Sequence, residues 1–125
     1  MNLDIAQLDA AVNDLKGLLK DGLLATDIWD RETGLSLAGH NAQPAAVALF
    51  TQVTNDLVAV LSNAGFPSLR RYLLLDLDGN STVMVIRHGE DVLQGMLLNN
   101  QRANLGLLIA VALPRMLESV AKARL

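Results

Sequence analysis

The sequence predicts an α+β domain in which a five-stranded antiparallel sheet carries helices on both faces. Helix-like and strand-like segments follow one another in the order α-β-β-α-β-β-β-α. Short turns that contain glycine separate the last three strand-like segments, which is typical of an antiparallel meander. Each helix-like segment has an apolar stripe that must be covered, and a sheet with helices on both faces satisfies that requirement. Residues 1–125 are expected to form a single domain.

The first third of the chain predicts a helix followed by a β-hairpin. Apolar residues recur at helical spacing over residues 3–20, with acidic residues early and lysines late, as the helix dipole favours. Gly22 is a natural stop for this helix. Residues 23–30 and 35–39 then form the two arms of the hairpin, and residues 31–34 supply its turn.

A second helix is predicted over residues 42–64, and Asp56 is its only charged residue. A helix that covers one side of a domain normally has a charged opposite face. The stripe expected to face the sheet holds most of the larger apolar residues: Ala46, Leu49, Phe50, Val53, Leu57, Val60, Leu61 and Ala64. Small or neutral polar residues occupy the other faces: Ala45, Ala48, Thr51, Gln52, Thr54, Asn55, Ala59 and Ser62. Because depletion of charge resembles the centre of a protein interface, this helix is expected to lie between its own sheet and a partner.

Three strands and a last helix complete the predicted order. The strands cover residues 70–77, 81–88 and 91–98, and the helix begins near Asn100. One face of this helix is apolar: Leu105, Leu108, Ile109, Ala112, Met116 and Val120. Pro114 falls inside it and is expected to kink or divide the helix, because proline lacks the backbone donor and crowds the preceding turn.

Composition excludes several classes of function. Hydrophobic residues make up 51% of the chain and charged residues 18%, below the usual share of about 25%, which favours a subunit contact. The net charge of −3 argues against a nucleic-acid partner, which needs clustered Lys and Arg. The absence of cysteine suits a cytoplasmic location, and the first residues lack the features of a signal peptide. The longest strongly apolar run, residues 105–113, is shorter than the roughly 18 residues of a membrane helix, so no membrane association is expected.

Residues that could support catalysis or bind metal do not form a recognisable site. Oxygen donors over residues 76–80 resemble part of a calcium loop, but the flanking strands favour a hairpin turn. His40 and His88 end predicted strands near glycines and are read as solvated imidazoles, although His88 with Glu90 or Asp91 could begin a metal site. No nucleophile elbow and no phosphate-binding glycine loop occurs. The prediction is therefore a non-enzymatic protein without catalytic, cofactor-binding or metal-binding residues.

In these features the chain resembles the roadblock/dynein light chain superfamily, which has a profilin-like architecture with the same order of elements. The resemblance covers nearly all residues from 3 to about 121. Its most telling pieces are the strand at residues 23–28 before the Gly34 turn and the segment 104–108 that opens the final helix. The longer, charged hairpin turn and Pro114 depart from the common family pattern. The resemblance implies a homodimer or heterodimer in which the second helices pack antiparallel and the third strands pair. It also implies a role as scaffold or as regulator of Ras-like small GTPases.

The residues themselves agree with such a dimer. The strand that begins at Arg70 carries charge only at its start and contains no proline, so its middle is suited to pairing at an edge. Gln52 and Asn55 could set the register between two crossing helices. The predicted dimer interface consists of Ala45, Ala48, Gln52, Asn55, Ala59, Arg71, Tyr72, Leu73 and Leu74.

The predicted function is that of a cytoplasmic homodimer that scaffolds or modulates a Ras-like small GTPase or a related complex. If it stimulates GTP hydrolysis, Arg31 and Arg87 are the candidates for an arginine that reaches the transferring phosphate in the GTPase. The simpler interpretation is that both are ordinary solvated surface side chains. The alternative is a small-molecule sensor with a pocket between sheet and helix, lined by Thr26, Trp29, Tyr72 and Gln94. A third possibility is an enzyme with a site around His40 or His88.

Overall fold

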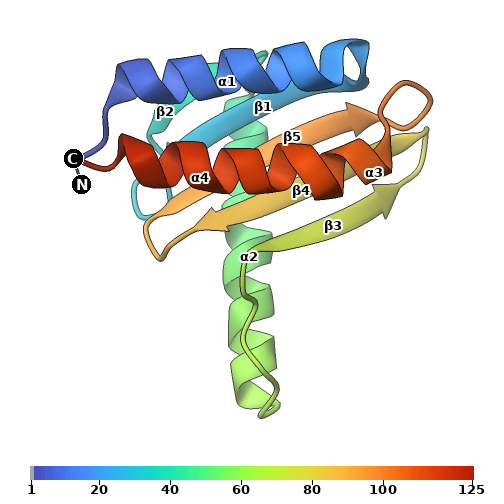
Figure 1. Ribbon diagram of the computed structural model, residues 1–125. Coiled ribbons are helices and arrows are strands. Elements are labelled where there is room, and N and C mark those ends of the chain that lie inside the picture. The colour runs from blue at the N-terminus through green and yellow to red at the C-terminus, as the bar shows by residue number, and fades with distance from the viewer. Residues whose placement is uncertain (1) are drawn as a thin grey trace.

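The computed structural model, which describes residues 2–125, has two unequal layers of helix around one sheet (Figure 1). The strands are β1 (Leu23–Asp30), β2 (Ser36–His40), β3 (Tyr72–Leu77), β4 (Ser81–His88) and β5 (Val92–Asn99). They form one antiparallel sheet in the order β2-β1-β5-β4-β3, so β2 and β3 are its edges. This arrangement confirms the predicted fold class.

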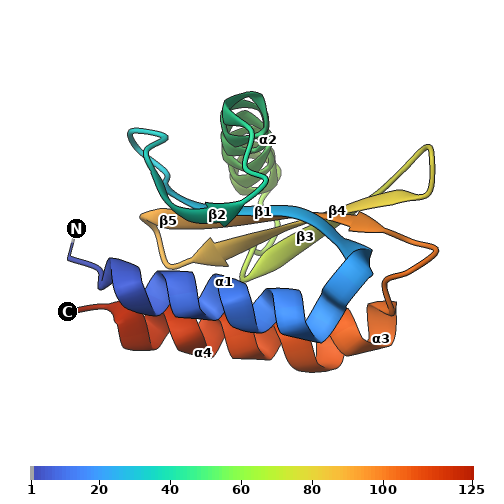
Figure 2. The ribbon, with the colours of Figure 1, turned by 90° about the horizontal axis from the view of Figure 1, so that it is seen from above.

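The helices that cover one face of the sheet lie side by side and antiparallel (Figure 2). They are α1 (Ile5–Leu19), the short α3 (Leu105–Leu107) and α4 (Leu113–Ala123). The Asp4 side chain caps α1 by accepting a hydrogen bond from the Gln7 backbone. The main core lies between these helices and the sheet, and Leu8, Leu15 and Met116 are almost completely buried there.

The end of the chain forms a divided helix, as Pro114 predicts. A π-helical segment, Leu108–Ala112, separates α3 from α4, and Pro114 stands in the first turn of α4. Proline is tolerated there because the local widening accommodates its ring and its missing N–H. The helix begins at Leu105 behind the N-cap Asn104, so the predicted start near Asn100 was wrong by five residues. Leu105 and Ile109 of the predicted apolar face are partly exposed, at 46% and 38%.

The turns follow the sequence closely. Gly79 and Asn80 both have positive φ, at 75° and 57°, in the tight turn between β3 and β4. This geometry confirms that residues 76–80 belong to a hairpin rather than to a calcium loop. In the first hairpin β2 begins at Ser36, one residue later than predicted, because Leu35 and Thr33 still take part in the turn.

The opposite face of the sheet carries a single helix, α2 (Pro44–Asn63), which crosses the strands and projects beyond β3 (Figure 1). Val47 and Thr54 are its only buried residues in the described chain. The predicted sheet-facing stripe was therefore wrong in its rotation: Leu49 and Val60 are 56% and 62% exposed, whereas Thr54 faces the sheet. The apolar residues at Phe50 and Leu57 do pack against the sheet.

By length and composition α2 is also apolar enough to cross a membrane, with a mean hydropathy of 1.4 over its most apolar window. The prediction from residues 105–113 alone missed this segment. Here, however, α2 is attached to the sheet by Trp29, Phe50 and Thr51. The helix therefore stays packed on the sheet, and its exposed apolar surface must be shielded from water by something outside the described chain.

Candidate interaction surface

The N-terminal half of α2 is fastened to the sheet around Trp29. The indole of Trp29 is 1% exposed and packs against Val47 and Leu93. Its Nε1–H donates to Thr51 Oγ1 at 2.8 Å, and this hydroxyl donates in turn to the Val47 carbonyl at 2.7 Å. This anchor fixes both the position of α2 and its rotation about its own axis.

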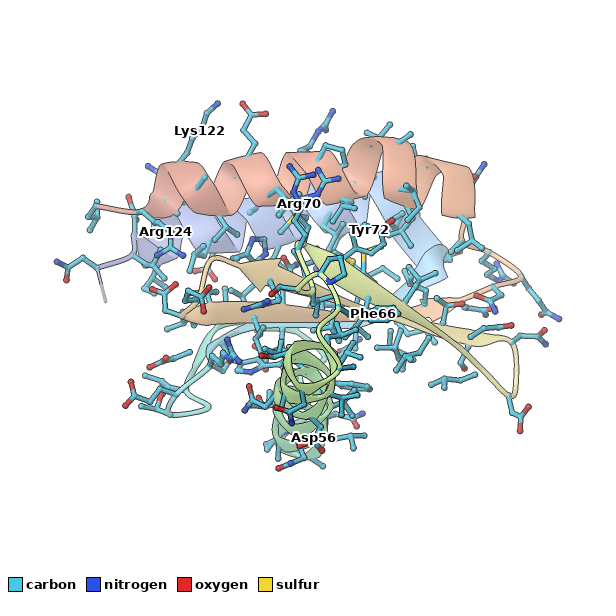
Figure 3. The ribbon with its side chains drawn as sticks, turned by 90° about the horizontal axis from the view of Figure 1, so that it is seen from below. Asp56, Phe66, Arg70, Tyr72, Lys122 and Arg124 are labelled. Atoms are coloured by element: carbon cyan, nitrogen blue, oxygen red, sulfur yellow. The ribbon has the colours of Figure 1, made fainter. Side chains whose placement is uncertain are left out.

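One long side of α2 contacts the hairpin between β1 and β2. Arg31 Nε donates to Asn55 Oδ1 at 2.8 Å, and Arg31 also lies 3.9 Å from the Glu90 carboxylate. On the outer surface of the helix, Gln52 Nε2 donates to Asp56 Oδ1 at 2.8 Å. Figure 3 looks along α2 and shows Asp56 on the side away from the sheet. The hairpin side of α2 thus already has polar partners within the chain.

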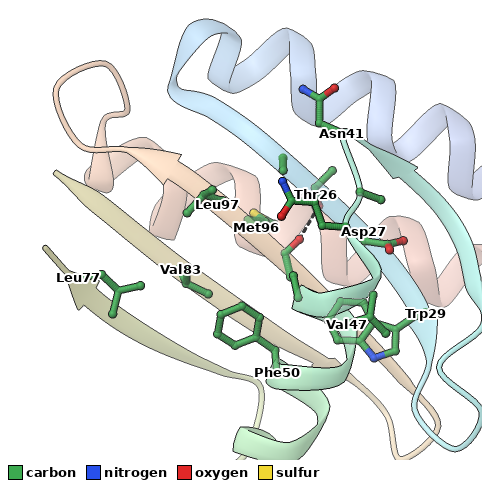
Figure 4. Close-up of a pocket in the computed structure, with 15 residues that line it drawn as sticks. Thr26, Asp27, Trp29, Asn41, Val47, Phe50, Leu77, Val83, Met96 and Leu97 are labelled. Carbon is green, nitrogen blue, oxygen red and sulfur yellow. Dashed lines mark hydrogen bonds between the residues drawn. The ribbon is translucent and has the colours of Figure 1, made fainter. Parts of the chain in front are cut away.

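The other long side of α2 borders a groove on the sheet, with a cavity of about 200 Å³ (Figure 4). Ala46, Val47 and Phe50 form its helix wall. Residues of four strands form its floor, among them Ala25 and Trp29 of β1, Met96 and Leu97 of β5, Val83 of β4 and Leu77 of β3. Asp27 lies at one end, where burial raises the pKa of its carboxyl although Ser36 Oγ donates to it at 2.6 Å. The groove is otherwise a neutral, apolar surface.

The edge strand β3 is free along one side. It pairs with β4 alone among the described strands, from Tyr72 opposite Ile86 to Leu77 opposite Ser81. No proline and no charge interrupts residues 72–75, and Leu74 is 39% exposed. Natural edges usually carry such interruptions, so this edge is suited to pair with another strand.

Comparison with known proteins gives a likeness in structure only. No protein-family model and no curated protein matches the sequence. Among solved structures, MglB from Myxococcus xanthus is similar with a TM-score of 0.81 and 10% identity, over 95% of this chain and 88% of that one. The gliding protein MglB from Thermus thermophilus has a TM-score of 0.79 and 14% identity, over 99% and 93%. A Roadblock/LC7 domain from Streptomyces avermitilis has a TM-score of 0.65 and 16% identity, over 91% and 94%.

The chain has the roadblock/LC7 fold. The resemblance inferred from the strand at residues 23–28 and the segment 104–108 is thereby confirmed at the level of the fold. At these identities the likeness says nothing about individual residues.

The predicted interface residues fall on two parts of the fold, α2 and the region of β3. Ala45, Ala48, Gln52, Asn55 and Ala59 are all exposed on α2, although Asn55 is already bonded to Arg31. Arg71 is exposed just before β3, Leu74 is exposed within it, Tyr72 is half-buried and Leu73 is buried. Their role in a dimer stays a prediction.

The two histidines differ in their surroundings. His40 is half-buried and its Nε2 lies 3.2 Å from Asn41 Nδ2. His88 is only 4% exposed, so its reading as a solvated imidazole was wrong. His88 ends β4, an inner strand that lies between β3 and β5 and is covered on both faces. Its position at the end of a predicted strand did not reveal that the strand would be an inner one.

A buried polar chain holds His88. Its Nε2 donates to Gln94 Oε1 at 2.9 Å, Gln94 Nε2 donates to Thr26 Oγ1 at 3.2 Å, and this hydroxyl donates to the Gly95 carbonyl at 2.8 Å. Burial, aided by the nearby charge of Arg124 and opposed by Gln94, lowers the pKa of His88 to about 4. Arg124 binds the Asp91 carboxylate at 2.8 and 3.0 Å and lowers the pKa of Asp91. His88, Asp91 and Arg124 also line an open cavity of about 360 Å³ between the end of β4 and α4.

Arg31 and Arg87, predicted as exposed arginines, are both held by the chain. The Arg31 side chain is 20% exposed and is bonded to Asn55. The Arg87 side chain is 8% exposed, donates to the Leu69 carbonyl at 2.6 Å and lies 3.5 Å from Glu90. The prediction of exposure was wrong for both, because each side chain finds acceptors within its own domain.

The predicted ligand pocket is found only in part. Trp29 and Thr26 both border the cavity beside α2, but the Thr26 hydroxyl is bonded into the buried polar chain with Gln94. Tyr72 instead packs against the core beneath α1 and α4, and Gln94 belongs to the buried polar chain on that face. Within residues 2–125, no group of three or more His, Cys, Asp or Glu side chains is placed to hold a metal ion.

Proposed function

We propose that this roadblock domain is a non-catalytic, dimeric regulator or scaffold that binds a Ras-like small GTPase in the cytoplasm. The observation that carries the proposal is α2: 20 residues with one charge, of which only Val47 and Thr54 are buried by the described chain. A helix so apolar and so exposed favours a protein partner. The free edge of β3 lies beside it and offers backbone groups for pairing with a second copy.

The GTPase part of the proposal rests on the resemblance to the roadblock superfamily. Members of that superfamily serve as scaffolds or as regulators of Ras-like GTPases. The structure adds a restriction on the mechanism. Arg31 and Arg87 are bonded within the domain, so an effect on GTP hydrolysis is expected to act by positioning the GTPase's own residues rather than by inserting an arginine.

Binding to a Ras-like GTPase encoded next to this gene tests the proposal. We expect a complex with one nucleotide form, loaded with GDP or with a non-hydrolysable GTP analogue, and a weaker one with the other form. Isothermal titration calorimetry with both forms measures this. We expect Arg31→Ala to leave any stimulation of hydrolysis in place. Absence of binding to either form would contradict the GTPase assignment while leaving the dimer untouched.

A small-molecule sensor is the second candidate, because a cavity does lie between α2 and the sheet. Its volume of about 200 Å³ is below the roughly 300–1,000 Å³ of typical ligand sites, and few polar groups converge on it. We therefore expect no metabolite or nucleotide in a thermal-shift screen to raise the melting temperature. A reproducible, concentration-dependent rise would favour the sensor instead.

A further inference from the structure

The start of α1 and the end of α4 are joined to each other near the turn between β4 and β5 (Figure 1). Leu3 and Arg124 form an isolated antiparallel bridge. The Asp4 N–H donates to the Ala123 carbonyl at 2.8 Å. By themselves these backbone contacts join the two segments only to each other and not to the sheet.

An arginine side chain fastens the joined segments to the sheet. Arg124 Nη1 and Nη2 donate to the two carboxylate oxygens of Asp91 at 3.0 and 2.8 Å, and Nη2 also donates to the His88 carbonyl at 2.9 Å. We call these three hydrogen bonds the Arg124 clasp. Charge-assisted, bidentate bonds of this kind are stronger than neutral ones. The clasp therefore holds the two segments on the turn between β4 and β5.

The open cavity beside the clasp is balanced in charge. Its charged lining side chains are two arginines and two carboxylates: Arg87, Arg124, Glu90 and Asp91. Arg87 Nη2 lies 3.5 Å from the Glu90 carboxylate, and Arg124 holds Asp91. The rest of the wall that α4 contributes is uncharged: Leu117, Val120 and Ala121. A third positive charge at this place would find no free carboxylate among the lining residues.

Protonation of His88 would add that third charge. The residue is 4% exposed, and its Nε2–H already donates to Gln94, so an added proton goes to Nδ1. The next groups in the buried polar chain, Gln94 on β5 and Thr26 on β1, carry no charge. Burial and the charge of Arg124 both disfavour the imidazolium, which lowers the pKa of His88 to about 4. Because a buried charge without a partner is costly, the surroundings must change when the proton binds.

The two arginines of the cavity differ in their freedom to move. The Arg87 side chain is 8% exposed and donates to the Leu69 carbonyl at 2.6 Å. The Arg124 side chain is 38% exposed and lies just beyond the end of α4. Helix ends open more easily than inner strands. Arg124 is therefore the cation that can move away from a charged His88, and its departure frees the Asp91 carboxylate as a counter-ion.

We propose that uptake of a proton by His88 opens the Arg124 clasp, so that the end of α4 and residues 2–4 move away from the turn between β4 and β5 while the sheet stays folded. Opening gives the imidazolium access to water and to the carboxylate of Asp91. Leu15 and Met116 lie farther along α1 and α4, and we expect these core residues to stay buried. The clasp is thus a pH-sensitive contact that requires neither the dimer nor a GTPase.

Amide hydrogen exchange, followed by NMR at pH 7 and pH 4 and expressed as protection factors, tests this opening. The Asp4 N–H reports on the clasp because its acceptor is the Ala123 carbonyl, and Met84 on the inner strand β4 reports on unfolding of the sheet. We expect Asp4 to be less protected than Met84 at both pH values and to lose protection about 100-fold on acidification. In His88→Gln we expect a loss below about fivefold, because Asp91, whose pKa is lowered, stays mostly ionised at pH 4. Equal protection of Asp4 and Met84, or an equal loss in His88→Gln, would overturn the proposal.

Two arginine variants keep the test decisive if His88→Gln folds poorly. Arg124→Gln removes the clasp, whereas Arg115→Gln removes a similarly exposed arginine of α4 that pairs with Asp14 of α1 at 3.2 Å. We expect Arg124→Gln to lower the protection of the Asp4 N–H at pH 7 at least about 10-fold, and Arg115→Gln to change it less than about threefold. Unchanged protection in Arg124→Gln, or equal losses in the two variants, would overturn the role of the clasp.

Discussion

Replacing Trp29 with alanine is expected to lower the free energy of unfolding by about 3–5 kcal/mol, the range for deleting a large buried aromatic side chain. The indole is 1% exposed, contacts Val47 and Leu93, and donates to Thr51. Without it, α2 loses the contact that fixes its rotation on the sheet. Because Trp29 is the only tryptophan of the chain, urea unfolding should be followed by circular dichroism at one fixed protein concentration.

Thr51→Val is the matched control for this anchor. Valine keeps the shape of threonine but leaves the Trp29 N–H without its acceptor, so we expect a loss of about 1–3 kcal/mol. The larger share of the Trp29→Ala effect then comes from packing. A loss below about 1 kcal/mol for Trp29→Ala would contradict the role of Trp29 as the anchor of α2.

Acidification from pH 6.5 to pH 4 is expected to remove about 3 kcal/mol of stability through His88 alone. Its pKa is lowered from 6.5 to about 4 in the fold, so between these values the unfolded chain binds the proton and the folded chain does not. The contribution of His88 to the free energy of unfolding is fully present above pH 6.5 and decreases as the pH falls toward 4. Below pH 4 this group causes no further change. Urea unfolding at pH steps across this range measures the slope.

The His88→Gln variant separates this effect from the carboxylates. A neutral amide keeps a hydrogen-bonding group near Gln94 but cannot take up a proton. Asp27, with a raised pKa, and Asp91, with a lowered one, titrate in both proteins, so their contributions cancel in the comparison. We expect the variant to be less stable at pH 7 but to lose less stability on acidification. Equal slopes in the two proteins would contradict the buried, neutral His88.

The order of elements and the turns could be predicted from the sequence because they depend on local signals. Gly79 and Asn80 specify a turn with positive φ, and Pro114 marks the place where the last helix is divided. The start of that helix was missed because Asn104, not Asn100, supplies the N-cap, and either asparagine suits that position.

The rotation of α2 could not be predicted for a physical reason. A helix that is apolar on several sides has no single stripe, so periodicity does not say which side meets the sheet. The deciding contact joins Trp29 to Thr51, two residues in different elements, and it turns the polar Thr54 inward and Leu49 outward. The sequence did contain one indication of the rotation: Thr51 and Thr54 lie on one side of α2, where a hydroxyl could accept the hydrogen bond of a buried indole.

Burial of charged and polar residues was missed for a related reason. Arg87 and His88 end a strand, a position that is usually solvated, but β4 is an inner strand with cover on both faces. Strand order in a sheet follows from long-range pairing, which one sequence does not reveal. The buried chain from His88 through Gln94 to Thr26 joins side chains of three strands and is visible only in three dimensions.

Sedimentation equilibrium of the unmodified chain tests most directly whether a second copy covers the exposed apolar surface of α2. We expect a species of about 27 kDa, twice the 13.4 kDa of one chain, over concentrations from about 1 to 200 µM. A mass of 13.4 kDa at the highest of these concentrations would contradict the dimer.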